Sequence, residues 1–185
     1  ETPWEVYPRT WSGAGGAFVL FVCHIAITLS QDAVAFHRLY GSSARHVVSG
    51  EWYRCATALL LHADSVHLAG NLVGIALFAT AVCSVTGWGV GWLLILASGI
   101  SGNLVNAYVY GYGHSAIGAS TAVFGALGLL SSYQLLKKIW TTGSRLQILM
   151  PLGSGLSHLA FTVTSSHNDI MSHLYGFVSG VLIVM

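Results

Sequence analysis

Long apolar runs separated by polar links constrain the fold of this chain more than any other feature. A bilayer core about 30 Å thick is crossed by roughly 20 apolar residues of helix. Six runs in the 185-residue sequence approach or reach this length, at residues 15–30, 63–86, 88–110, 118–136, 146–163 and 170–185. This pattern predicts an all-α membrane protein built as a bundle of six transmembrane helices.

The composition supports insertion into a membrane and excludes other classes of protein. Hydrophobic residues make up 54% of the chain and charged residues only 7%, whereas soluble domains carry roughly 25% charged residues. The formal net charge is +1, and without a basic run to neutralise phosphates, nucleic acid is not expected as a partner. The three cysteines lie in or beside apolar runs, which is typical of small buried side chains rather than of disulfides or a metal site.

The runs indicate one membrane domain, residues 15–185, preceded by a polar N-terminal segment, residues 1–14. The last run holds 16 residues from Ile170 onward, which is about 24 Å of helix at 1.5 Å per residue. This is short of a full crossing, so we expect the helix to be truncated here and to continue beyond Met185.

The charges in the links predict an orientation. The link 137–145 contains three basic residues and no acidic one, and short links of this kind stay on the cytoplasmic side. The N-terminus is then also inside, and the even-numbered runs all begin on the extracytoplasmic side. We expect the chain to lie in the plasma (inner) membrane with this orientation.

Polar side chains at the starts of the even-numbered runs are the candidate functional residues. Such groups are costly in a membrane and mark functional paths or partners. His67 and Asn71 begin the second run and share one helix face. His62 lies about 140° away on an ideal helix, or in the loop before it. No HExxH motif or cysteine pair supports a zinc site here, and no metal or cofactor is expected.

Ser120 begins the fourth run, and its hydroxyl has three alternative roles: a helix cap, a packing group or a nucleophile. Phe124 lies one turn further along the same face. Glycines at positions 118, 125 and 128 allow a neighbouring helix to approach closely.

The sixth run carries His173, Gly176 and Gly180 on one helical stripe. If this stripe packs on the fourth run, the imidazole of His173 reaches Ser120. A serine hydroxyl needs such a base before it can attack a carbonyl. Oxyanion donors could come from His67, Asn71 and the backbone N–H of Ser120. Asp169 is better explained as a helix N-cap than as a third catalytic residue, so the residues favour a Ser–His dyad.

At these residues the sequence resembles the rhomboid family of intramembrane serine proteases. The family's G-x-S-x-x-x-F/Y-G/A motif corresponds to the stretch from Gly118 to Gly125. Its His-x4-His-x3-Asn motif corresponds to His62, His67 and Asn71, and its His-x2-Gly-x3-Gly motif to His173, Gly176 and Gly180. The resemblance spans about residues 12–185. It departs from the family pattern in the stretch "GEWYR", where Tyr53 rather than tryptophan precedes Arg54, and the second run lacks an acidic residue near its end.

The resemblance implies a serine endopeptidase that cuts single-pass transmembrane proteins in or near their membrane helix, with the active site open to the extracytoplasmic side. It implies Ser120 as the nucleophile and His173 as the general base, with Phe124 stacked on the imidazole. It also implies His67, Asn71 and Ser120 as the oxyanion hole, and His62, Gly118, Gly176, Gly180 and Arg54 as supporting residues. Membrane lipid is the other expected partner.

Two alternative functions are weighed against the protease. A non-catalytic relative that binds membrane helices usually lacks the serine or the histidine, and both are present here. A channel or transporter needs a path of ionisable groups across the membrane, for which only His24 and His158 remain. We interpret both of these as buried core histidines.

Overall fold

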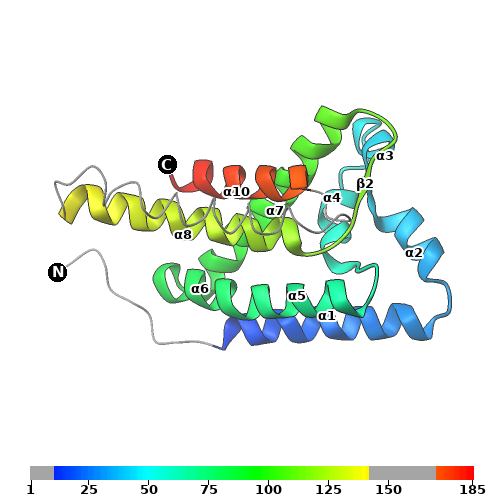
Figure 1. The fold of residues 1–185 in the computed structure, drawn as a ribbon, viewed down its shortest axis with the longest axis horizontal. Coiled ribbons are helices and arrows are strands. Elements are labelled where there is room, and N and C mark those ends of the chain that lie inside the picture. Colours follow the sequence, from blue (N-terminus) through cyan, green and yellow to red (C-terminus); the bar gives the residue numbers. More distant parts are fainter. Residues whose placement is uncertain (1–10, 142–169) are drawn as a thin grey trace.

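The computed structural model describes residues 11–141 and 170–185, which are mostly helical (Figure 1). One pair of two-residue strands runs antiparallel, with Ser42 opposite Ala116. The elements in chain order are α1 (Ser12–Leu29), α2 (Ala33–Tyr40), β1 (Ser42–Ser43), α3 (Ala44–Val48), α4 (Arg54–Thr57), η1 (Ala58–Leu60), α5 (Ser65–Gly74), η2 (Ile75–Ala79), α6 (Thr80–Thr86), α7 (Trp88–Tyr110), β2 (Ser115–Ala116), α8 (Ser120–Thr141) and α10 (Ile170–Val184).

Three helices within the described residues are long and apolar enough to cross a membrane. These are α1, the continuous helix Ser65–Thr86 formed by α5, η2 and α6, and α7. The predicted fourth and sixth runs correspond to α8 and to the shorter apolar helix α10. The fifth run, 146–163, lies outside the described residues. The helical membrane class is therefore confirmed, while the count of six spans stays a prediction.

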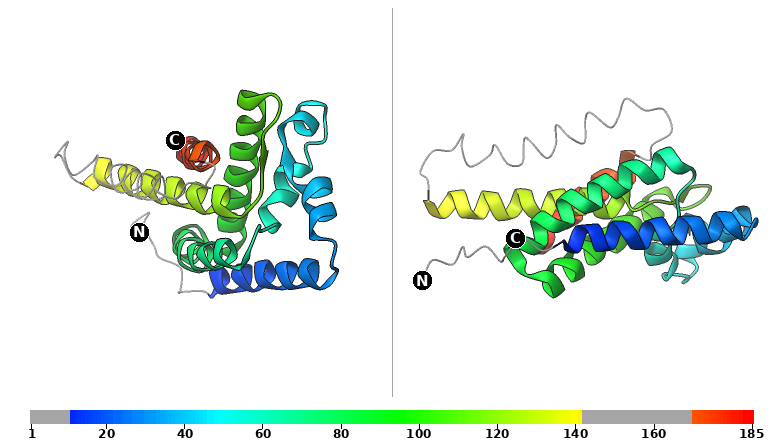
Figure 2. Two further views of the ribbon diagram at one scale, coloured as in Figure 1. Left: turned by 45° about the vertical axis from the view of Figure 1, so that its right-hand side comes forward. Right: turned by 90° about the horizontal axis from the view of Figure 1, so that it is seen from below.

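The helices pack in two groups around α8. Figures 1 and 2 show α10 beside α8, with α7 crossing both, while α1 and the Ser65–Thr86 helix lie together on the other side. The largest buried cluster joins these groups through Leu20 of α1, Ile75 of η2, Ile95 of α7 and Val123 of α8. Because lipid tails are as apolar as these side chains, close packing rather than water exclusion has to hold the helices together.

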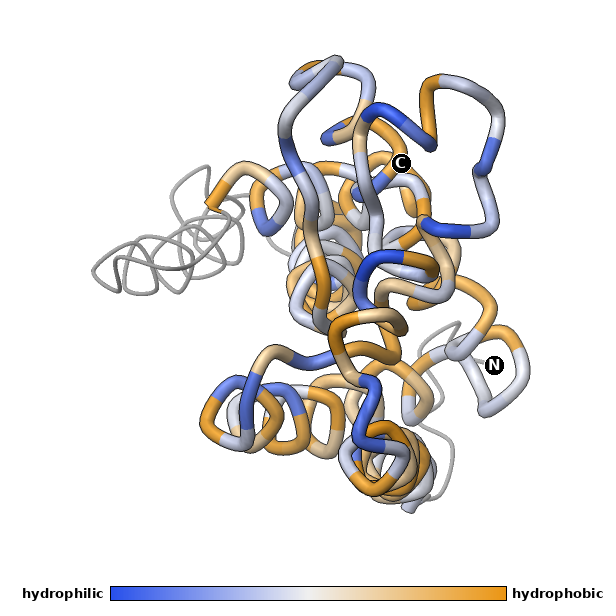
Figure 3. Tube along the Cα trace, turned by 90° about the vertical axis from the view of Figure 1, so that its right-hand side faces the viewer, coloured by the Kyte–Doolittle hydropathy of each residue, from blue (hydrophilic) through white to orange (hydrophobic). Residues whose placement is uncertain are grey.

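The link 31–62 between the first and second apolar runs folds into short elements at one end of the bundle. Figure 3, which looks at this end, shows hydrophilic stretches (blue) on connecting segments and hydrophobic stretches (orange) along the helices. The helices α5, α8 and α10 all begin at this same end (Figure 1). This arrangement brings the polar starts of the three helices together.

Candidate active site

Ser120 is the first residue of α8 and is partly exposed. The loop before it turns at Gly118, whose φ of +119° is a conformation that side-chain-bearing residues rarely adopt. The Gly118 N–H donates to the carbonyl of Ala58 at 2.9 Å, which holds the loop against η1. The amides of a helical first turn have no partner within the helix, and the N–H of Ser120 is one of them.

His67 and Asn71 lie directly beside this loop. A Cβ built on Gly118 would lie 2.6 Å from Nε2 of His67 and 3.7 Å from Nδ2 of Asn71. Asn71 is buried, and its amide nitrogen donates to the carbonyl of His67 at 3.0 Å. Because an amide nitrogen carries two hydrogens, this bond leaves one donor. Two side-chain nitrogens of α5 therefore lie against the residue two positions before Ser120.

Asp64 fixes the start of α5. Its carboxylate accepts a hydrogen bond from the backbone N–H of His67 at 2.8 Å and forms the N-cap. This bond holds the pKa of Asp64 below its usual value. The sequence pattern did not predict this cap, although an aspartate directly before a helix is an N-terminal signal.

His173 lies on α10 and is buried against α8. Its ring stacks on Phe124, with centroids 4.6 Å apart and an angle of 22° between the planes. Further along α10, a Cβ on Gly176 would collide with the carbonyl oxygen of Thr121, and one on Gly180 with that of Gly125. The glycine stripe thus packs backbone against backbone on α8. Since Phe124 is one turn beyond Ser120, the imidazole lies over the first turn of the helix that Ser120 begins.

His62 lies in the loop before α5, which settles the position that its spacing left open. It is buried, and its ring meets that of His67 edge-on, with centroids 5.3 Å apart. On its other side is the ring of His24 at 6.4 Å. His24 is only partly buried, so its interpretation as a core histidine is wrong. Within the described ranges no three His, Cys, Asp or Glu residues are grouped so that they could hold a metal ion.

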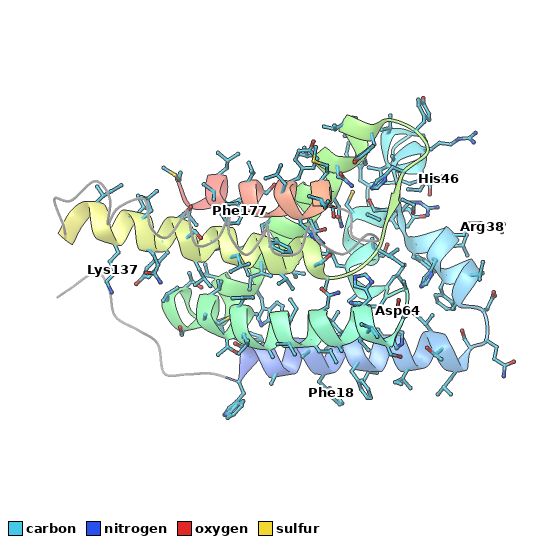
Figure 4. All side chains as sticks on the ribbon, in the orientation of Figure 1. Phe18, Arg38, His46, Asp64, Lys137 and Phe177 are labelled. Carbon is cyan, nitrogen blue, oxygen red and sulfur yellow. The ribbon has the colours of Figure 1, made fainter. Side chains whose placement is uncertain are left out.

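Arg54 is almost fully buried and joins the parts of the link 31–62. Its Nε donates to Glu51 at 2.7 Å, and its Nη1 donates to the carbonyls of Arg38 at 2.9 Å and Gly41 at 3.3 Å. Figure 4 labels Arg38 and His46 at this end of the molecule. Glu51, which was not among the predicted site residues, also pairs with His46 at 2.8 Å. The guanidinium therefore organises the link that carries Ala58, the partner of the Gly118 loop.

These contacts predict an acid-sensitive link. Hydrogen bonds from Arg54 and then His46 lower the pKa of Glu51 from 4.5 to about 2. A lowered pKa adds stability that is present above pH 4.5 and is lost as the pH falls towards 2. We expect the melting temperature of Glu51→Gln to lie below that of the wild type at pH 6. The difference between the two melting temperatures should shrink as the pH falls from 4.5 to 2. Thermal melts in detergent measure this difference in melting temperature. Asp32→Asn, which also removes a carboxylate from the link 31–62, serves as the matched control. A difference that is constant down to pH 2 contradicts the prediction.

Some predicted features lie outside the described residues. They are the N-terminal segment apart from its last few residues, most of the basic link 137–145, His158, and Asp169 with its suggested capping role. Their assignments stay predictions. The described residues bring together Ser120, the Gly118 loop, His67, Asn71, Phe124 and His173 at one end of the bundle. His62 packs against His67, and Arg54 bonds within the link that contacts the Gly118 loop.

The comparisons with known proteins agree in the family they indicate. A family model described as a rhomboid domain matches residues 49–185. The rhomboid protein YdcA of Bacillus subtilis (strain 168) is 32% identical over 162 residues, which cover 85% of this chain and 75% of YdcA. Rhomboid protease GluP of the same organism is 32% identical over 166 residues, which cover 88% of this chain but 31% of GluP. The chain thus spans less than a third of GluP.

A more distant match is named for a lack of activity. Inactive rhomboid protein 2 of Homo sapiens is 27% identical over 141 residues, which cover 74% of this chain and 16% of that protein. Matches of this kind establish kinship over most of the chain, while activity has to be argued from the site.

Proposed function

Because the chain belongs to the rhomboid family, we propose that it is an intramembrane serine endopeptidase that cuts transmembrane proteins in or near their membrane helix. The observation that carries the proposal is the grouping of three distant motifs around the first turn of α8. The Gly118 loop adjoins His67 and Asn71, and Phe124 stacks on His173. Serine, imidazole and amide donors at one place are what acyl transfer requires.

In the proposed mechanism Ser120 attacks the scissile carbonyl while His173 accepts the hydroxyl proton. The imidazolium then protonates the leaving amine, and a water molecule activated by the same ring hydrolyses the acyl-enzyme. The stack on Phe124 restricts the plane of the imidazole, and in the proposed mechanism this restriction helps to orient the ring for proton transfer from Ser120. These two groups suffice for the proton transfers, and we propose that they act as a Ser–His dyad.

Nε2 of His67, the remaining amide hydrogen of Asn71 and the N–H of Ser120 are the proposed oxyanion donors. Their support is proximity, since both side-chain nitrogens adjoin the position where Gly118 lacks a Cβ. Donors held in place before the reaction stabilise the tetrahedral intermediate without reorganising. Gly118 serves this site by leaving room for the donors, and His62 by packing against the ring of His67.

The proposed substrates are single-pass transmembrane proteins. A membrane helix has every backbone carbonyl in a hydrogen bond, so it must unwind locally before Ser120 can attack one. Hydrolysis also needs water, which favours a site near the membrane surface. We propose that this surface is the extracytoplasmic side of the plasma membrane. Lys137 begins the basic link 137–145, which is expected on the cytoplasmic side, and it lies at the opposite end of the molecule from Asp64 at the start of α5 (Figure 4).

Labelling with a serine-reactive fluorophosphonate tests the proposal. We expect the purified chain in detergent to be labelled on one residue, and Ser120→Ala to lose the label, because only an activated hydroxyl attacks this reagent. Ser132→Ala removes a buried hydroxyl further along the same helix and is expected to label like the wild type. A wild-type chain that stays unlabelled, and does not cut a transmembrane substrate, would instead be a non-catalytic member that binds membrane helices.

A further inference from the structure

A buried asparagine on α7 connects the link 31–62 to the residue after Ser120. Asn103 is 2% exposed, and its amide nitrogen donates to the carbonyl of Cys55 at 2.9 Å. Its side-chain oxygen accepts a hydrogen bond from the hydroxyl of Thr121 at 3.0 Å. Both partners are themselves buried. The three groups form a chain of two hydrogen bonds that runs from α4 through α7 to the first turn of α8.

The same link holds the segment before Ser120. The backbone N–H of Ala44 donates to His114 at 2.9 Å, Ser42 pairs with Ala116, and Ala58 accepts from Gly118. These contacts reach the chain only as far as two residues before the nucleophile. The bond from Thr121 to Asn103 is the contact that anchors the residue immediately after it, so Ser120 is held from both sides.

Thr121 also lies between the helices that have to meet at the site. Its Cγ2 would lie 2.7 Å from a Cβ on Gly102 of α7 and 3.0 Å from a Cβ on Gly176 of α10. A change in its side-chain rotamer would therefore press on the helix that carries His173. A single torsion, χ1, orients the threonine side chain, and the branched Cβ restricts χ1 to few rotamers. The hydrogen bond to Asn103 therefore fixes the rotamer of Thr121.

From this chain of contacts we infer that Asn103, acting through Thr121, is a positioning residue for the nucleophile. It fixes the position of the first turn of α8 relative to the link 31–62 and to α10. The inference rests on the proposed function, because positioning has a kinetic meaning only if Ser120 attacks a substrate. A misplacement of reacting groups by about 1 Å can cost on the order of 10²-fold in rate.

The competing explanation is that Asn103 only stabilises the bundle, as interhelical hydrogen bonds do. The two explanations predict different measurements. A purely structural bond affects the melting temperature and the amount of folded protein, whereas a positioning bond lowers kcat in protein that is folded. A matched control exists on the same helix, where the hydroxyl of Ser132 donates to the carbonyl of Val181 on α10 at 3.3 Å.

The deciding experiment compares Thr121→Val, Thr121→Ser and Ser132→Ala by cleavage of a model transmembrane substrate in detergent, with melting temperatures recorded in parallel. Valine keeps the shape of threonine and removes the hydroxyl. We expect Thr121→Val to lower kcat 10- to 100-fold with KM within about twofold, and Thr121→Ser to stay within about threefold of the wild type. Ser132→Ala is expected to keep its kcat.

A double variant shows whether the two side chains act as one unit. If they do, Asn103→Ala combined with Thr121→Val loses no more activity than Asn103→Ala alone. Unchanged kcat in Thr121→Val, or an equal loss in Ser132→Ala, overturns the inference while leaving the protease proposal intact. A wild type that neither cuts the substrate nor reacts with a fluorophosphonate overturns both.

Discussion

Replacing His173 with alanine is expected to abolish cleavage of a transmembrane substrate while the protein stays folded. The hydroxyl of Ser120 is a weak nucleophile until a base removes its proton, and the imidazole stacked on Phe124 is the group proposed to do so. Loss of the catalytic histidine in a soluble serine protease costs about 10⁶-fold in kcat, so a fall of at least about 10⁴-fold is expected here. Single-turnover cleavage in detergent measures it.

His114 offers a matched control for this substitution. Its ring also stacks on an aromatic side chain, Tyr110, with centroids 4.2 Å apart and an angle of 16° between the planes. His114→Ala therefore removes a comparable ring contact from the chain, while the backbone carbonyl that bonds to Ala44 remains. We expect its activity within a few fold of the wild type. Substantial cleavage by folded His173→Ala would show that His173 is not the general base.

Enlarging Gly180 is expected to inactivate the site without touching any catalytic group. A Cβ at this position would collide with the carbonyl oxygen of Gly125 and lie 3.0 Å from the backbone nitrogen of Leu129. A leucine must therefore push α10 away from α8, and His173 moves with it. Since a displacement of about 1 Å can cost roughly 10²-fold, we expect Gly180→Leu to lose at least that factor in kcat.

Two further variants separate this effect from general damage to a membrane helix. Gly180→Ala adds only the colliding Cβ and is expected to fall between the wild type and Gly180→Leu. Gly89→Leu places the same side chain on α7, where a Cβ would meet no atom within 4 Å, and should keep full activity. Melting temperatures identify variants that have unfolded. Normal turnover in folded Gly180→Leu would mean that the spacing of α8 and α10 does not control the reaction.

The sequence alone was sufficient for the membrane class and for most helix positions. The predicted runs 15–30, 88–110 and 118–136 correspond to α1, α7 and α8, because the length and polarity of a membrane helix follow from local composition. The three motifs were found as residue types at fixed spacings within short stretches of the sequence. Their family assignment is confirmed by the match over residues 49–185.

Other features depended on contacts between distant parts of the chain, which local patterns do not encode. Nothing in the local pattern of the link 31–62 indicates that Arg54 bonds to Glu51 and to two backbone carbonyls. His62 could not be placed by spacing alone, and the partly exposed His24 was assigned to the core.

Only the tertiary structure decided which polar groups meet around Ser120. Asn103 is one of several polar residues in the apolar run 88–110, yet it joins Cys55, 48 residues away, to Thr121, 18 residues away. The glycine at position 118 was recognised as part of a motif, but the space that it leaves is occupied by side chains of α5. Sequence determines that a buried polar group needs a partner in the membrane, whereas the packing of the helices determines which partner is within reach.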